Sequence, residues 1–307
     1  MNRKKIAFIG AGQIGGVAAT LAGMRGLGDV VLYDIVEDMP QGKALDISHM
    51  APIFNADFKI TGTNDIADIT GSDVCFVTSG VPRKPGMSRD DLLKINASIV
   101  DSVAAGIKEH APNALVIVTT NPLDVMVHRM YKQLGFESNM VVGMAGVLDT
   151  GRYRSFLAKE LNVSVSSVSA FVLGGHGDSM VPVRSYTNVG GIPIEQMIDK
   201  KRLDEIEQRV RGAGGEVVGL LKTGSAFVSP AAAGIEMIES YLYDQKKVLP
   251  VSALCQGQYG INDLYIGVPT IIGAGGVEKV IEIDLSDDEK KQLAASIESV
   301  KNTVESL

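Results

Sequence analysis

Short apolar runs alternate with stretches of helical periodicity through the first half of the chain. We interpret the runs at residues 6–9, 30–33, 58–61, 74–78, 115–119 and 140–142 as strands. Helical patterns occupy residues 13–25, 41–50, 88–109 and 123–134 between them. Strands that are apolar throughout and separated by helices indicate a parallel sheet covered on both faces. The sequence therefore predicts a doubly wound α/β architecture for this half.

The pattern changes after residue 145. We expect helices at 149–161, 203–222 and 226–243, and a last helix that starts at Ser286. Strands are expected at 168–173, 181–187, 248–254, 264–268 and 280–283, with a turn at Gly190 and Gly191. This mixture predicts an α+β domain packed on the first one. A chain of 307 residues suits about two domains of ordinary size, which we place at residues 1–145 and 146–307.

Three helix ends carry local signals. Ser88 and Asp91 form the pattern Ser-x-x-Asp of a helix N-terminus. Gly135 follows the helix predicted at 123–134 and is expected to stop it. Pro122 opens the same helix, because a proline is well tolerated in the first turn.

Composition and charge exclude several classes of protein. The net charge is −7 and only 21% of residues are charged, which argues against a dedicated nucleic-acid binder and against disorder. Cys75 and Cys255 are the only cysteines and the four histidines form no cluster, so we expect neither a disulfide framework nor a metal site. The run at 6–9 is too short for a signal peptide, and no stretch approaches a membrane span. We therefore expect a cytoplasmic protein whose partner is a small molecule or another protein.

A glycine-rich string, GAGQIG at residues 10–15, follows the first strand and opens the first helix. The first glycine of such a string permits the tight turn, the second lets the backbone approach a diphosphate, and the third lets helix and strand pack closely. The diphosphate would bind N–H groups at the positive end of the helix. We assign to cofactor binding Gly10, Gly12, Gln13, Ile14 and Gly15. The alternative is that the glycines serve packing alone; a P-loop is excluded, since Gly-x-x-x-x-Gly-Lys-Ser/Thr does not occur.

Asp34 follows the second predicted strand and lies 19 residues after Gly15. An acid at this position of a Rossmann unit binds the ribose of a dinucleotide. Its carboxylate accepts hydrogen bonds from a free ribose diol and repels a 2′-phosphate, and no arginine occurs at 35–37 to neutralise one. We therefore expect NAD rather than NADP. In the alternative interpretation Asp34 only caps the next helix.

His176 stands among glycines in Gly-Gly-His-Gly-Asp, directly after a predicted strand. An imidazole with a pKa near neutrality can take a proton from an alcohol as hydride leaves the same carbon. Such a histidine needs a partner that holds one tautomer, usually a carboxylate. Asp149 is the candidate, because Asp178 is too near in sequence to reach the ring easily. The alternative is a turn histidine without a role.

Asp149 and Arg152 are three residues apart at a predicted helix start and so share a face. One could hold the histidine while the other binds a substrate carboxylate through a bidentate fork. The alternative is an ordinary surface ion pair.

Two segments follow neighbouring strand ends, where ligands bind to an open parallel sheet. The loop at 80–89 contains Arg83, Lys84 and Arg89, which could close over an anion, although a basic loop can also be merely solvated. Asn121, in Thr-Asn-Pro, could offer its amide to the cleft or simply belong to a turn.

Taken together, these motifs resemble the lactate/malate dehydrogenase family, in order and over the whole chain. The resemblance implies a Rossmann domain followed by a substrate domain, and reversible hydride transfer between NAD and a 2-hydroxy acid. It also implies assembly as homodimers or tetramers. The pattern is similar to the lactate-dehydrogenase-like branch of malate dehydrogenases, which implies a dicarboxylate substrate and a step of the tricarboxylic acid cycle.

The same resemblance implies roles for individual residues. His176 is the proton acceptor and donor, Asp149 orients it, and Arg152 binds the carboxylate next to the reacting carbon. Asn121 hydrogen-bonds near the reacting oxygen and the cofactor, and its bond to Pro122 is expected to be cis.

Arg83 is the discriminating position. By the resemblance, Arg89 polarises the carbonyl, whereas position 83 carries glutamine in lactate enzymes and arginine in malate enzymes. Ala226 favours malate too, since lactate enzymes often have threonine there. The alternatives are an L-lactate dehydrogenase and, in other classes, a non-catalytic NAD-binding regulator or a metal-assisted sugar hydrolase. The sugar hydrolase would require metal ligands that we do not find in the sequence.

Overall fold

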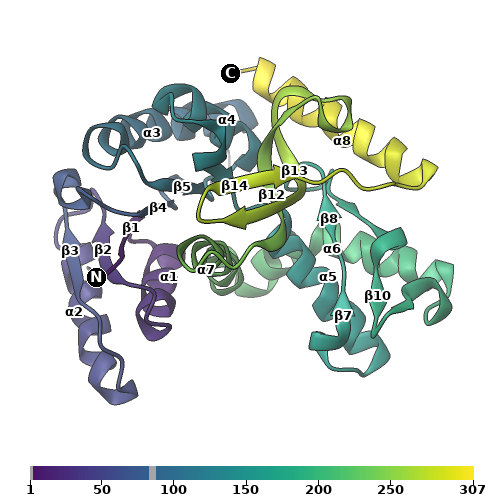
Figure 1. Ribbon diagram of the computed structural model, residues 1–307, viewed down its shortest axis with the longest axis horizontal. Helices are drawn as coiled ribbons and strands as arrows, with labels where there is room; N and C mark the ends of the chain where they lie inside the picture. Colours follow the sequence, from purple (N-terminus) through teal and green to yellow (C-terminus); the bar gives the residue numbers. More distant parts are fainter. Residues whose placement is uncertain (1–2, 83–87) are drawn as a thin grey trace.

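The computed structural model describes residues 3–82 and 88–307. Within them a nine-stranded sheet has the order β14-β13-β12-β6-β5-β4-β1-β2-β3 (Figure 1). The strands from β3 to β6 are parallel, as predicted for a doubly wound fold. They are β1 (Lys5–Ile9), β2 (Asp29–Tyr33), β3 (Ile60–Thr63), β4 (Val74–Val77), β5 (Leu115–Val118) and β6 (Val141–Gly143).

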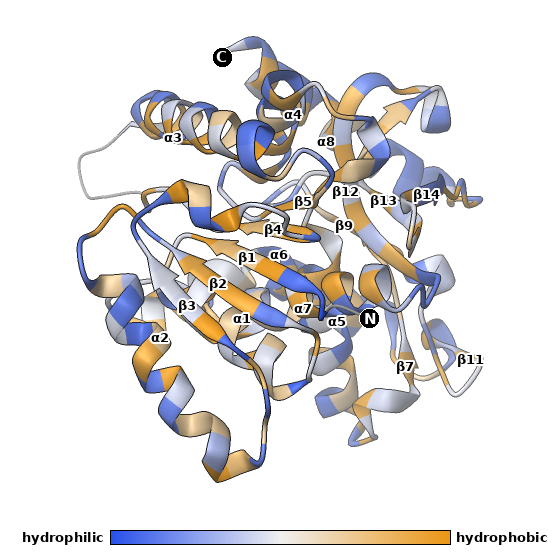
Figure 2. Cartoon of the chain, turned by 60° about the vertical axis from the view of Figure 1, so that its left-hand side comes forward, coloured by the Kyte–Doolittle hydropathy of each residue, from blue (hydrophilic) through white to orange (hydrophobic). Residues whose placement is uncertain are grey.

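Alternate residues of β1 face different helices. Ile6 and Phe8 pack in one core with the helices α1 (Gln13–Met24) and α7 (Val228–Leu242). Ala7 and Ile9 pack in a second core with α3 (Arg89–His110) and α4 (Leu123–Leu134). The period of two along a strand therefore explains why the inner strands β4 and β5 are apolar throughout and β1 is apolar after Lys5. Figure 2 shows largely orange strands beside helices of mixed colour.

The sheet continues into the second half of the chain. The strands β12 (Lys247–Gln256), β13 (Asn262–Gly273) and β14 (Gly276–Val280) form an antiparallel meander. Ser252 of β12 pairs with Gly143 of β6 and so joins this meander to the parallel strands. From the sequence, we expect these strands in a separate domain, but the sheet crosses the predicted boundary at residues 145 and 146. The boundary itself stays a prediction.

The remaining helices and strands of the second half surround this extension. They are α5 (Gly146–Leu161), β7 (Val168–Ser169), β8 (Val172–Leu173), β9 (Val181–Pro182), β10 (Asn188–Val189), β11 (Ile192–Pro193), α6 (Lys200–Leu221) and α8 (Asp287–Glu305). In the first half, α2 (Met39–Met50) follows β2. Short 3-10 helices connect these elements: η1 (Ala51–Phe54), η2 (Ile66–Ile69), η3 (Ser138–Met140), η4 (Val165–Ser167), η5 (Arg184–Tyr186), η6 (Ile194–Gln196) and η7 (Gln258–Gly260).

Several predicted boundaries are confirmed and several are wrong. The helix at 123–134 has the predicted bounds, Gly135 ends it in the left-handed conformation, and Ser88 forms a capping box with Asp91. The predicted strand at 58–61 lies at Ile60–Thr63, because pairing with β2 begins only at Ile60. The single strands predicted at 168–173 and 181–187 are instead short pairs and a 3-10 turn, and the one at 280–283 lies at Gly276–Val280. In these cases the pairing partner decides where the ladder runs, and local propensity does not.

Among the helices of the described residues, none is both long enough and apolar enough to cross a membrane.

Candidate active site

The carboxyl ends of β1, β2, β4 and β5 meet at one edge of the sheet, because neighbouring parallel strands point the same way. The loop after β1 contains the glycine-rich string, and Asp34 follows β2. Asn121 follows β5, and the peptide bond between Asn121 and Pro122 is cis, as the resemblance implied. The topology therefore brings together segments that are far apart in the sequence.

The three glycines of the string have different structural roles. Gly10 has φ +111°, a conformation that side chains other than glycine rarely adopt. A Cβ atom at Gly15 would lie 1.8 Å from the carbonyl oxygen of Gly10, so Gly15 lets α1 pack directly on the strand end. A Cβ atom at Gly12 would have no heavy atom of the described chain within 4 Å. Packing therefore requires Gly15 but leaves Gly12 open to a ligand.

The start of α1 fits a dinucleotide. Its N-cap is Gly12, and no side chain of the described residues caps its first-turn N–H groups. These N–H groups and the positive end of the helix suit a diphosphate. The carboxylate of Asp34 accepts hydrogen bonds from the backbone N–H groups of Ala11 (2.7 Å) and Val36 (3.0 Å), which holds it beside the glycine loop. Each of its oxygens keeps a lone pair for a ribose hydroxyl.

Lys43 also belongs to this end of the site, although sequence reasoning missed it. Its Nζ atom donates a hydrogen bond of 2.9 Å to the carbonyl oxygen of Gly12. Burial lowers the pKa of Lys43, and the nearby charge of Asp34 opposes this effect. No arginine occurs at 35–37, directly after Asp34, but α2 places Lys43 next to Gly12 from further along the chain.

His176 and Asp149 meet as predicted. The distance from His176 Nδ1 to Asp149 Oδ2 is 2.7 Å, and Arg152 donates from Nη1 to Asp149 Oδ1 at 3.0 Å. Asp149 is 1% exposed and the side chain of Arg152 is 14% exposed, so this is not a surface ion pair. The same carboxylate therefore orients both the imidazole and the guanidinium.

The surroundings of His176 raise its pKa above the ordinary value. Burial lowers the pKa of His176, but the charge of Asp149, its hydrogen bond to the ring and the charge of Asp124 together outweigh that effect. The positive charge of Arg152 acts in the lowering direction. The imidazole is thus held in a setting that favours its protonated form more than water does.

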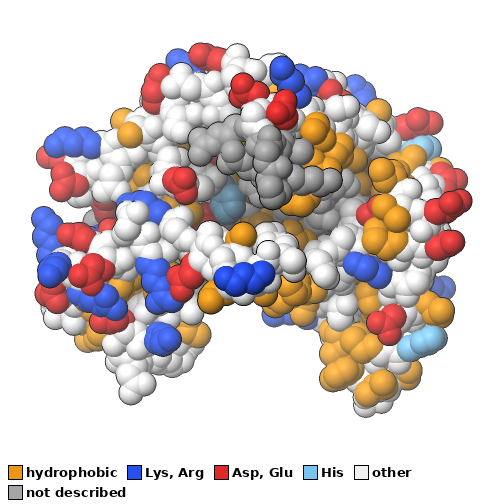
Figure 3. Space-filling model, turned by 180° about the vertical axis from the view of Figure 1, so that it is seen from behind, with side chains coloured by type: hydrophobic (Ala, Val, Ile, Leu, Met, Phe, Trp, Pro, Cys, Tyr) orange, Lys and Arg blue, Asp and Glu red, His pale blue; other side chains and the backbone are white. Residues whose placement is uncertain are grey.

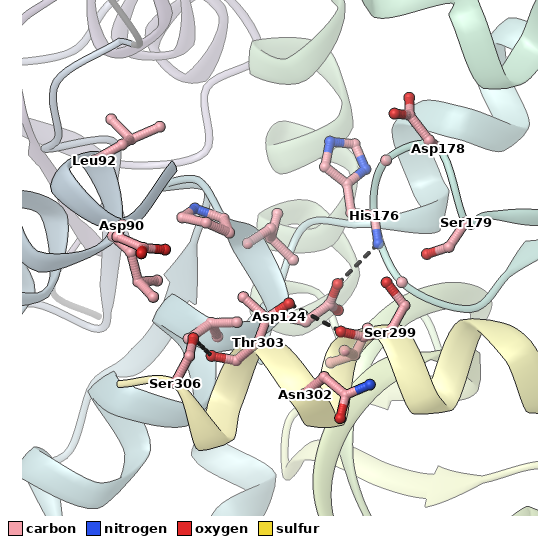
Figure 4. Close-up of a pocket in the computed structure, with 17 residues that line it drawn as sticks. Asp90, Leu92, Asp124, His176, Asp178, Ser179, Ser299, Asn302, Thr303 and Ser306 are labelled. Atoms are coloured by element: carbon pink, nitrogen blue, oxygen red, sulfur yellow. Dashed lines mark hydrogen bonds between the residues drawn. The ribbon is translucent and has the colours of Figure 1, made fainter. Parts of the chain in front are cut away.

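Asp124 is a second carboxylate that sequence reasoning missed. It is 4% exposed, and it accepts hydrogen bonds from the backbone N–H of His176 (2.8 Å) and from Ser252 Oγ (2.7 Å). Figure 4 shows it between the backbone of His176 and the helix α8. Burial raises the pKa of Asp124, and these two donors act against that rise. An aspartate inside the apolar string Leu-Asp-Val-Met-Val of α4 was the available signal.

The histidine loop is fastened to elements from the end of the chain. Gly174 pairs with Gly267 of β13 through hydrogen bonds of 2.8 Å and 3.1 Å. The N–H of Gly175 donates to Ser296 Oγ of α8 at 2.8 Å. The position of His176 therefore depends on β13 and α8 as well as on its own loop.

A cavity of about 290 Å³ unites residues from both halves of the chain. Ile14 and Asn121 line it from the cofactor side, and His176, Arg152 and Ala226 line it from the other side. A second cavity, of about 690 Å³, lies beyond the backbone of His176 between α3, α4 and α8 (Figure 4). Of these two cavities, the first is lined by an imidazole, by guanidinium groups and by a residue of the glycine-rich string.

Arg211 lines the smaller cavity too and was not singled out from the sequence. Its Nε atom donates to the carbonyl oxygen of Met180, and its Nη2 atom donates to Gln292 Oε1 of α8. Asp178 is exposed and lines the same cavity. Arg83 lies outside the described residues; Arg89 begins α3, and its side chain is outside the described atoms.

We expect Asp149→Asn to lower the pKa of His176, because it removes both the facing charge and its strengthening of the ring hydrogen bond. Asp124→Asn should lower the pKa of His176 by less, because Asp124 contacts only the backbone of the histidine. NMR titration of the His176 ring protons measures both shifts. An unchanged pKa in Asp149→Asn would show that the contact between the two residues is not maintained in solution.

Substitution of two glycines of the string should separate packing from ligand binding. Gly15→Ala places a Cβ atom against the carbonyl of Gly10 and should lower the free energy of unfolding by about 1 to 3 kcal/mol. Gly12→Ala should leave stability within about 0.5 kcal/mol and weaken NADH binding roughly tenfold. Chemical denaturation and NADH fluorescence titration test this pair; equal loss of stability in both variants would contradict it.

Comparisons with known proteins show to which family the chain belongs. Residues 4–143 match the NAD binding domain of lactate/malate dehydrogenase, and residues 146–307 match its alpha/beta C-terminal domain. The chain is similar to the malate dehydrogenase of Cryptosporidium parvum, with 48% identity, coverage of 99% of this chain and 98% of that one, and a TM-score of 0.96.

Two further solved structures show the same likeness. The lactate dehydrogenase of Cryptosporidium parvum, complexed with lactic acid and nicotinamide adenine dinucleotide, has 50% identity, coverage of 99% and 98%, and a TM-score of 0.97. The malate dehydrogenase of Salinibacter ruber has 50% identity, coverage of 98% and 97%, and a TM-score of 0.94. Both activities thus occur among relatives at the same level of identity. The chain is a member of the lactate/malate dehydrogenase family and, as such, an NAD-dependent enzyme with a Rossmann domain and an α/β C-terminal domain.

Proposed function

We propose that this protein is an NAD-dependent malate dehydrogenase, which interconverts malate and oxaloacetate. The observation that carries the proposal is the buried carboxylate of Asp149, which contacts both His176 and Arg152. These two residues line one cavity together with Ile14 and Asn121. A proton carrier and a carboxylate-binding cation beside a dinucleotide loop are what a 2-hydroxy acid dehydrogenase requires.

NAD, when bound, supplies the acceptor for the hydride that leaves the hydroxyl-bearing carbon. His176 takes the proton of the hydroxyl group on Nε2. Asp149 makes this possible, because its hydrogen bond to Nδ1 keeps the proton of the neutral ring on that nitrogen and leaves Nε2 basic. In the reverse direction the protonated ring returns the proton to the carbonyl oxygen, and the raised pKa of His176 keeps that form available.

Arg152 binds the carboxylate next to the reacting carbon. Because Nη1 donates to Asp149, the guanidinium plane is oriented before the substrate binds. The side chain of Arg152 therefore loses less conformational entropy on binding. We assign to Asn121 a hydrogen bond near the reacting oxygen, and to Arg89 the polarisation of the carbonyl. The cavity position of Asn121 supports its role; the role of Arg89 rests on the sequence.

The choice of malate over lactate rests on Arg83 and Ala226. Malate has a second carboxylate that needs a cation, and the sequence has arginine at position 83, where lactate enzymes carry glutamine. Ala226 lines the cavity, and its small side chain leaves room for a four-carbon acid. Removal of one partner of a buried charge pair costs about 2 to 5 kcal/mol, which is roughly 30-fold to several thousandfold in affinity. L-Lactate dehydrogenase is the second candidate, because relatives with that activity are as similar.

We further propose that the enzyme is a homo-oligomer. We also propose that it is located in the cytoplasm and that it catalyses a step of the tricarboxylic acid cycle. Leu45, Ile53 and Phe54 are exposed on α2 and η1, where apolar side chains gather on the lobe at the lower right of Figure 3. A groove of about 690 Å³ between α5, α6 and α7 is lined by Phe156 and Leu220, among others. Apolar surface on both a convex and a concave face favours a contact between copies.

The wild-type enzyme should reduce oxaloacetate with NADH far more efficiently than pyruvate. Arg83→Gln should lower kcat/KM for oxaloacetate by roughly 30-fold to several thousandfold and should raise relative activity with pyruvate. Steady-state kinetics with both keto acids at saturating NADH measures the ratio. Equal or better turnover of pyruvate by the wild type would refute the malate assignment.

Phe54→Asp should reduce the mass of the assembly, because it places a charge in the exposed apolar patch. Val165→Asp is the matched control, since Val165 is also exposed but lies on η4, outside the patch and the groove. Sedimentation velocity of both variants and the wild type gives the masses. A monomeric wild type, or an unchanged mass in Phe54→Asp, would exclude this interface.

A further inference from the structure

One residue on the buried side of α3 breaks its apolar pattern. Leu93, Asn96, Val100, Val103 and Ile107 follow one another at spacings of three and four, so they form one stripe along the helix. The apolar members of this stripe belong to the core between α3 and the sheet. Asn96 is 1% exposed within it. A buried amide is costly unless its hydrogen bonds are made, so its partners identify its purpose.

Within the described residues, the side chain of Asn96 hydrogen-bonds only to backbone groups at the carboxyl edge of the sheet. Its Oδ1 atom accepts a hydrogen bond from the N–H of Val81 at 2.8 Å, and its Nδ2 atom donates to the carbonyl oxygen of Val81 at 3.2 Å. Nδ2 also donates to the carbonyl oxygen of Asn121 at 2.7 Å. The two bonds to Val81 reproduce the pairing that a neighbouring strand makes with one residue, although β4 has ended at Val77.

A second contact joins the same two segments directly. Thr120 Oγ1 donates to the carbonyl oxygen of Ser79 at 2.6 Å. A Cβ atom at Gly80 would lie 2.7 Å from Thr120 Cγ2 and 3.3 Å from Asn96 Oδ1, so the segments after β4 and β5 approach closely around the amide. Asn96 is therefore the bridge between two backbones that belong to different strand ends.

We propose that Asn96 is a positioning residue for the substrate end of the active site: it sets the backbone of Asn121 relative to Val81, which stands two residues before Arg83 in the sequence. This inference rests on the proposed function, because it concerns residues assigned to the substrate. Asn96 makes no hydrogen bond to the glycine loop or to Asp34, and it contacts the cofactor side only through the backbone carbonyl of Asn121, so its loss should weaken substrate binding far more than NADH binding.

Asn96→Asp is the sharpest test. Aspartate keeps the shape of asparagine and the acceptor for the N–H of Val81, but it replaces the amide donor by an oxygen that faces two carbonyl oxygens. We expect kcat/KM for oxaloacetate to fall roughly 10- to 100-fold, through a higher KM and a lower kcat. The Kd of NADH in the binary complex should stay within about twofold.

Asn64→Asp is the matched control. Asn64 also donates from Nδ2 to two backbone carbonyls, those of Asp34 and Val36, but at the ribose end of the sheet edge. The variant makes the same chemical change there and should leave the KM for oxaloacetate unchanged at saturating NADH. Thr120→Val gives a second reading if Asn96→Asp does not fold, because it removes the direct contact with Ser79 and should raise the same KM to a smaller extent.

The possible results test the positioning role of Asn96 separately from the proposed function. Unchanged kinetics in folded Asn96→Asp, or an unchanged KM in Thr120→Val where Asn96→Asp does not fold, would overturn the positioning role. A loss of NADH affinity equal to the loss of substrate affinity would overturn it too, since that result indicates a general structural defect. A wild type that reduces neither oxaloacetate nor pyruvate would refute the proposed function itself.

Discussion

The candidate active site depends on one buried carboxylate. Asp149 is enclosed by protein, and a bare charge in that position would be costly. It is tolerated because one of its oxygens contacts His176 and the other accepts from Arg152. The same arrangement that satisfies the charge also orients the imidazole and the guanidinium and raises the pKa of His176. Stability and chemistry at this site are therefore consequences of the same contacts, and a change at Asp149 affects both.

The continuous sheet anchors this arrangement through several elements. His176 is not held by its own loop alone, since Gly174 pairs with β13 and the backbone N–H of His176 donates to Asp124 of α4. Asp124 in turn accepts from Ser252 of β12, the residue through which the antiparallel strands join the parallel ones. The junction between the two parts of the sheet is thus linked through Asp124 to the backbone of His176. A preorganised site of this kind does not have to be assembled at each turnover.

Charge is distributed unevenly over the molecule. The chain as a whole is acidic, with a net charge of −7, yet Arg152 and Arg211 line the cavity beside His176. At the dinucleotide loop Lys43 lies next to Gly12. Cations are thus concentrated where anionic groups are expected to bind, in surroundings that screen them less than water does. The overall charge of a sequence is therefore a poor guide to the sign of the ligand that an enzyme binds.

Local patterns in the sequence were sufficient for the doubly wound fold, the glycine loop with Asp34 and the capping box of α3, whereas the pairing of His176 with Asp149 was a candidate that the family resemblance also implied. These features depend on short-range periodicity, on backbone conformation or on a small set of chemical motifs. The sequence did not reveal Asp124, Lys43, Arg211 or Asn96, because each of them meets its partner only when distant segments pack together. It also failed to show that β12, β13 and β14 extend the first sheet, since strand pairing between segments a hundred residues apart is decided by which edges remain open after the helices have packed. Local physics chose the elements and the chemistry, and the tertiary structure chose which polar groups satisfy one another.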